Sequence, residues 1–258
     1  MARSGTLGFP ADRRRSIVLA LLLLLAGLAW AVMLAREMPM EDDGRVLTMG
    51  FGFPLFVVTW ALMMAAMMLP SMSPMLDAFV RIQQRHRELG NRVIPPIAFT
   101  AGYLVLWGLS GVVAFFPARW LEDYAMERDW PASHLARAGG GLILAAGVYQ
   151  LSPAKRFCLS RCRTPMSFIA TSWRDGAGGA LRMGLVHGGL CLGCCWLLAA
   201  ILIPLGIMSV AAMVAVTALV FAEKVLPASL RVTEVSAAAL IAYGLLVLAV
   251  PGALPNLT

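Results

Sequence analysis

The stretch that decides the fold is residues 182–203, RMGLVHGGLCLGCCWLLAAILI. Only its first residue carries a full charge, and its length matches the roughly 20 residues that a helix needs to cross a bilayer. In hydrocarbon the backbone must satisfy its own hydrogen bonds, so a stretch of this kind forms a helix. The sequence therefore predicts a membrane-spanning helix that holds one histidine and three cysteines.

Similar apolar stretches recur along the chain. The protein is 60% hydrophobic and only 14% charged, which is unlike a soluble domain of 258 residues. We predict a single all-α, polytopic transmembrane bundle over residues 1–258, with about seven spans at 16–35, 52–73, 96–117, 136–152, 182–203, 206–222 and 235–251. Three arginines before a leucine run also resemble a signal peptide, whose cleavage would leave six spans. We expect an uncleaved anchor, because the apolar run is long for a signal peptide.

The charges between the spans predict the orientation. With the N-terminus inside, the inner segments hold 16 of the 21 lysines and arginines and the outer segments hold five. This bias satisfies the positive-inside rule. We therefore predict a bacterial inner-membrane protein with a cytoplasmic N-terminus and a periplasmic C-terminus. The net charge of +7 then reflects topology and contact with anionic lipid, and we expect no nucleic-acid partner.

The predicted fifth span carries a stripe of side chains that bind soft metals. His187, Cys191, Cys194 and Cys195 are spaced i, i+4, i+7 and i+8, so they share one face of a helix. A lone cysteine in such a helix is usually a packing residue. Three cysteines aligned with a histidine at membrane depth instead favour ligand or redox chemistry.

The predicted second span carries a cluster of five methionines, Met63, Met64, Met67, Met68 and Met72. Three of them stack at intervals of four residues on one helix face. Methionine is also a common core residue, so packing remains an equal alternative. The second and fifth spans run in opposite directions in the predicted topology. Both clusters therefore lie near mid-membrane, and we expect them to meet.

Thioether, thiol and imidazole together favour copper(I) as the bound ion. A monovalent copper ion with one thiolate and neutral methionine or histidine ligands makes a neutral site, whereas zinc needs two thiolates. Zinc remains an alternative, as does haem with His187 and a methionine as axial ligands. The chain has no HExxH, P-loop or GxGxxG motif, which favours a role other than that of an enzyme.

A second cysteine pair, Cys158 and Cys162, lies among four cations of the longest predicted inner segment. Nearby cations lower the pKa of a thiol, so we predict a reactive pair that transfers a soft metal at the cytoplasmic side. Ordinary reduced thiols are the equal alternative, because the cytosol disfavours a structural disulfide. Glu223 and Lys224 are expected to pair locally at the inner end of the predicted sixth span.

Two short motifs carry a resemblance to a known family. Ala66-Met67-Met68 and the CxGCCW sequence at residues 191–196, together with His187-Gly188, resemble a bacterial family of predicted metal-binding integral membrane proteins, known as a domain of unknown function. The resemblance covers roughly residues 52–225. It implies an inner-membrane protein that binds a metal, and it implies neither a substrate nor a reaction.

Three functions remain open. The leading hypothesis is a copper(I) transporter, or a chaperone that exchanges copper with a metallochaperone or an exported metalloprotein. The second is a membrane thiol oxidoreductase that uses Cys191 and Cys194 as an exchanging pair. The third is a haem-binding redox subunit. The lipid bilayer is the expected environment in each case, and an oligomer is compatible with all three.

Overall fold

The computed structural model describes residues 9–35, 47–48, 50–88, 96–128, 130–206 and 209–254. These residues form helices and no strand, which confirms the all-α prediction. The elements are α1 (Phe9–Ala35), α2 (Phe53–Glu88), α3 (Pro96–Glu127), α4 (Ala132–Gln150), α5 (Pro153–Arg163), α6 (Pro165–Ser172), α7 (Gly176–Ala200), α8 (Leu202–Leu205), α9 (Val210–Val225), η1 (Ala228–Leu230), α10 (Val232–Ala249) and η2 (Pro251–Ala253).

Five segments within the described ranges are long and apolar enough to cross a membrane. They contain α1, α2, α3, the α7–α8 segment Gly176–Leu205, and the η1–α10 segment Ala228–Ala249. They coincide with five of the seven predicted spans. The other two predicted spans correspond to α4 and α9, which are helices of 19 and 16 residues and are not among the five. Residues 207–208 of the predicted sixth span lie outside the described ranges.

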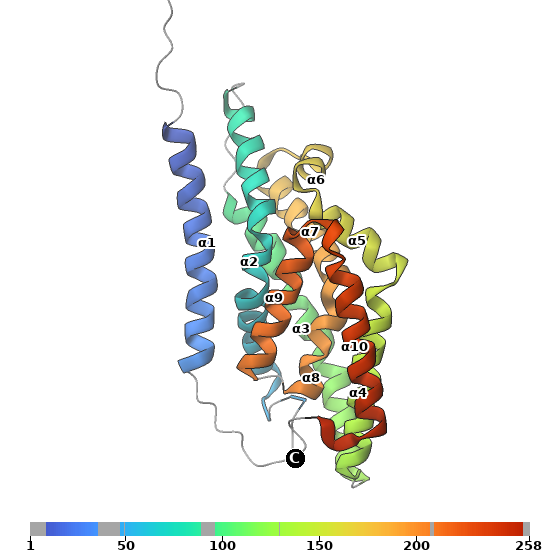
Figure 1. Ribbon diagram of the computed structural model, residues 1–258. Coiled ribbons are helices and arrows are strands. Elements are labelled where there is room, and N and C mark those ends of the chain that lie inside the picture. Colours follow the sequence, from blue (N-terminus) through green and yellow to red (C-terminus); the bar gives the residue numbers. More distant parts are fainter. Residues whose placement is uncertain are drawn as a thin grey trace, which may run out of the picture.

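The long helices lie side by side (Figure 1). The outermost helix is α1, which packs on α2; α2 in turn packs on α3 and α9. The helix α3 packs along α7, and α4 pairs with α10. The short helix α5 follows α4 and packs on α7. Large apolar side chains cover the exterior, for example Leu24 at 68% and Val113 at 72% exposure, as a lipid-facing surface would require.

Two glycines bring α3 and α7 into backbone contact. A Cβ added at Gly102 would lie 2.1 Å from the carbonyl oxygen of Leu181, and one at Gly184 would lie 2.0 Å from that of Phe99. Small residues allow this close approach of helices. The contact sets the distance between the side chains that follow Gly102 on α3 and those that follow Gly184 on α7.

The prolines inside α2 free backbone carbonyls that other groups then satisfy. Pro70 has no N–H to donate to the carbonyl of Ala66. That carbonyl instead accepts a hydrogen bond from Trp30 Nε1 of α1 at 3.0 Å. Such a replacement partner offsets the cost of leaving the freed oxygen without a hydrogen bond.

Candidate metal centre

Cys191 of α7 lies at the centre of a buried cluster of polar and sulfur groups. Its Sγ is 3.0 Å from the Lys224 Nζ of α9, which donates a hydrogen bond to it. The hydroxyl of Tyr103 on α3 is 3.1 Å from the same sulfur. Cys195 Sγ, one helical turn further along α7, is 3.9 Å from Cys191 Sγ. Three groups from three helices therefore surround one fully buried thiol.

The helix α2 reaches this cluster through the same two polar side chains. Lys224 Nζ also donates to Ser71 Oγ at 2.8 Å, and the Tyr103 hydroxyl donates to the Met68 carbonyl at 3.4 Å. The five predicted methionines of α2 are all fully buried and share one apolar core with the cysteines of α7. Lys224 and Tyr103 therefore link α2 with Cys191 of α7, and direct contact between the methionines and the cysteines stays a prediction.

Local sequence signals position α5 against this cluster. Its first turn has Pro153 at N1, and the side chain of Ser152 accepts a hydrogen bond from the Lys155 backbone N–H. The helix ends before Thr164, as is usual for the residue that precedes a proline. The sequence therefore builds a short helix where we had predicted only a loop.

The cysteines of α5 face those of α7. The thiol of Cys162 hydrogen-bonds with that of Cys194, which also donates to the Cys191 carbonyl at 3.1 Å. A Cβ added at Gly193 would lie 2.8 Å from Cys158 Sγ, so the absence of a side chain there admits this thiol. All five cysteines are free thiols. The five thiols form a series that runs from half-buried Cys158 on α5 to fully buried Cys191 on α7.

The prediction that nearby cations lower the pKa of the α5 thiols is wrong. Burial raises the pKa of Cys158, and the interaction with Cys194 together with burial raises that of Cys162 well above its ordinary value. The neighbouring cations have other partners. Lys155 is buried in an ion pair with Glu223, and Arg163 Nε donates to a backbone carbonyl.

His187 lies one turn before Cys191 on α7, in an aromatic enclosure. Its ring stacks on those of Phe99 and Tyr103, with centroids 6.0 and 5.5 Å apart, and also contacts Phe168 at 5.7 Å. Both ring nitrogens are buried and have no hydrogen-bond partner among the described residues. A buried polar group of this kind is costly unless a partner satisfies it.

The predicted ligands do not form one compact site. In the described parts of the chain, no three His, Cys, Asp or Glu side chains are placed to hold a metal ion together. Cys191 Sγ lies 3.9 Å from Cys195 Sγ, and the Cys194 thiol interacts with Cys162, Cys191 and Cys195. Two sulfurs 3.9 Å apart can each lie about 2.3 Å, an ordinary metal–thiolate distance, from one ion between them.

A second buried network lies next to the cysteine cluster. Lys155 Nζ is 2.7 Å from Glu223 Oε2 and also donates to the side-chain oxygen of Gln150. Gln150 Nε2 donates to Glu223 Oε1 at 2.9 Å and to Ser236 Oγ at 3.0 Å. The expected local pairing of Glu223 with Lys224 is therefore wrong. Both lysines, which we had counted among the inner-segment cations, are buried inside the bundle.

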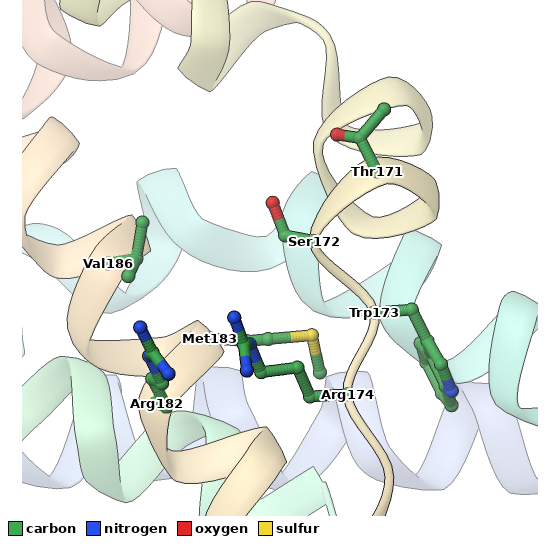
Figure 2. Close-up of a pocket in the computed structure, with 7 residues that line it drawn as sticks. All are labelled: Thr171, Ser172, Trp173, Arg174, Arg182, Met183 and Val186. Carbon is green, nitrogen blue, oxygen red and sulfur yellow. The ribbon is translucent and has the colours of Figure 1, made fainter.

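A basic pocket of about 350 Å³ lies beside the start of α7 (Figure 2). It is lined by Thr171, Ser172, Trp173, Arg174, Arg182, Met183 and Val186. Met183 is buried and precedes His187 and Cys191 at intervals of four residues, so the three share one face of α7. Met183 was not among the predicted ligands, although its spacing from His187 and Cys191 is visible in the sequence.

One comparison with known proteins identifies the family. A family model described as "PpoB2: Copper chaperone" matches residues 57–247. The chain belongs to this family. No curated protein and no solved structure matches the chain. The match spans all the predicted ligand residues and Lys224, and it supports the predicted metal-binding family and a function related to copper.

Proposed function

We propose that this protein is a bacterial inner-membrane copper chaperone that holds copper(I) between Cys191 and Cys195. The observation that carries the proposal is the pair of thiols 3.9 Å apart, buried in the same core as the methionines of α2. Thiolate and thioether ligands suit copper(I). A neighbouring methionine, such as Met68, would serve as a neutral third ligand. Copper(I) is the cargo of this site, and a metalloprotein is the partner that receives it.

The remaining thiols supply a route between the buried pair and the surface. Copper(I) moves between proteins by exchange from one thiolate to the next, so each step needs a neighbouring thiol. Cys194 follows Cys191 on α7 and contacts Cys162, and Cys158 lies against Gly193 one turn from Cys162. Cys158 is the most exposed of the five cysteines described. With the predicted orientation, this route opens at the cytoplasmic side, where a metallochaperone would dock.

Thiol–disulfide exchange by Cys191 and Cys194 would use some of the same thiols. Cys191 Sγ contacts Lys224, Tyr103 and Cys195, and the Cys194 thiol interacts with Cys162, Cys191 and Cys195. An exchanging pair forms a disulfide and needs no metal, so copper loading distinguishes the two functions. A haem would need free space beside His187, and that ring is enclosed by aromatic side chains.

The test is anaerobic loading of the detergent-purified protein with copper(I) or zinc(II), followed by elemental analysis. We expect about one copper ion per chain in the wild type, with loss in a Cys191→Ser/Cys195→Ser variant. A Cys158→Ser/Cys162→Ser variant is the matched control: it should keep its copper but release it to a competing chelator more slowly. A wild-type protein that binds no copper would refute the proposed function.

A further inference from the structure

Lys224 places a positive charge directly on the thiol pair. Its side chain is buried, and its Nζ contacts Cys191 Sγ at 3.0 Å and Ser71 Oγ at 2.8 Å. Among the described residues it forms no ion pair with a carboxylate. The neighbouring carboxylate of Glu223 is held by Lys155 and Gln150 instead. The charge of Lys224 is therefore available to the sulfur cluster alone.

A buried ammonium group is costly unless an opposite charge compensates it. Ser71 is neutral and supplies only a hydrogen-bond acceptor. Cys191 Sγ, 3.0 Å from Nζ, is the nearest group that can supply the opposite charge, and it does so as a thiolate, the form that binds a metal ion. The ammonium group thus contributes a fixed charge of +1 to any complex that forms on this thiol pair.

The total charge of that complex differs between metals. Copper(I) with two thiolates carries −1, and Lys224 brings the complex to zero. Zinc(II) with two thiolates is neutral by itself, and Lys224 leaves the complex at +1. Net charge at membrane depth is strongly disfavoured. The net charge worked out from the sequence gave copper(I) one thiolate ligand, because Lys224 was not included. With Lys224 included, a neutral copper(I) site has two thiolate ligands.

We propose that Lys224 is the specificity-determining residue of the site, and that its charge selects a monovalent ion over a divalent one. This inference rests on the proposed copper site between Cys191 and Cys195. The lysine does not bind the ion. It acts through the thiolates, and replacing it by a neutral side chain reverses which dithiolate complex is neutral.

The decisive experiment compares copper(I) and zinc(II) affinities of the wild type, Lys224→Met and Lys224→Arg, by anaerobic competition with calibrated chelators at one pH. Lys224→Met should lower the copper-to-zinc affinity ratio roughly ten-thousandfold, because an uncompensated charge within a span corresponds to roughly a hundredfold and the substitution moves that charge from the zinc complex to the copper complex. Lys224→Arg keeps the charge and should keep a ratio close to that of the wild type. An unchanged ratio in Lys224→Met would overturn the inference.

A second variant tests the same charge without removing the lysine. Ser71→Asp places a carboxylate beside Nζ, neutralises the fixed charge, and should lower the ratio in the same direction as Lys224→Met. Ser71→Ala, its matched control, should leave the ratio near that of the wild type. If the wild type binds no copper, the proposed function itself fails. If the wild type binds copper through Cys191 and Cys195 but both charge-altering variants keep its ratio, the selectivity inference alone fails.

Discussion

Replacing Gly184 by alanine should force α3 and α7 apart. The added Cβ would lie 2.0 Å from the Phe99 carbonyl oxygen, about 1.4 Å short of the 3.4 Å at which ordinary contact begins. The obstructing atom belongs to the backbone of α3, so no change of side-chain rotamer relieves the clash. The two helices must separate by a distance of that order, or one of them must distort.

The separation would reach the cysteine cluster within about one helical turn. Tyr103 follows Phe99 by four residues on α3, and its hydroxyl is only 3.1 Å from Cys191 Sγ. An added 1.4 Å would break that contact. Overpacking of this kind typically costs about 1–3 kcal/mol. We therefore expect Gly184→Ala to lower both the midpoint of thermal unfolding in detergent and the affinity for copper(I), measured by competition with a chelator.

Gly189→Ala on the same helix is the matched control. A Cβ there meets nothing closer than Leu106 Cδ2 at 3.7 Å, and alanine favours a helix by up to about 1 kcal/mol over glycine. This variant should be as stable as the wild type or slightly more so. If Gly184→Ala matches it in both stability and copper affinity, the argument that backbone contact between α3 and α7 holds Tyr103 at the thiol is refuted.

Three further outcomes follow from the buried contacts. Glu223→Gln should destabilise the protein by about 3–5 kcal/mol in denaturant unfolding, because Lys155 is left as an uncompensated buried charge; Lys155→Met/Glu223→Gln should recover part of that loss. Trp30→Phe leaves the Ala66 carbonyl without its hydrogen-bond donor and should lower the free energy of unfolding by about 1–3 kcal/mol in the same assay. Unchanged stability would mean that another group donates a hydrogen bond to this oxygen. Burial raises the pKa of Cys158, so its alkylation by iodoacetamide should be slower at neutral pH than that of a free thiol and should rise only at more alkaline pH; fast alkylation at neutral pH would contradict this.

The parts of the centre that lie on one helix could be read from the sequence. Helical periodicity is a local property, so the spacing of His187, Cys191 and Cys195 predicted their common face before any packing was known. The same holds for the methionines of α2, all of which are buried.

The charged partners could not be predicted, because their burial depends on where short helices end. Lys155 and Lys224 follow apolar stretches, and the sequence pattern predicts that such cations lie at a membrane surface and flank a span. In the structure α4 and α9 have 19 and 16 residues, and α5 folds back onto α7. The two lysines are therefore enclosed by other helices. Nothing in the local sequence specifies that enclosure.

Glu223 and Lys224 join the two halves of the centre through one peptide bond. Glu223 holds α5, through Lys155 at its side chain and Arg163 at its backbone carbonyl, whereas Lys224 contacts the thiol of Cys191. Because α5 also carries the two outer thiols, the helix that would pass copper onward is fixed to the residue that sets the charge at the inner pair. Movement of α5 away from α7 would have to break a buried ion pair or carry the end of α9 with it.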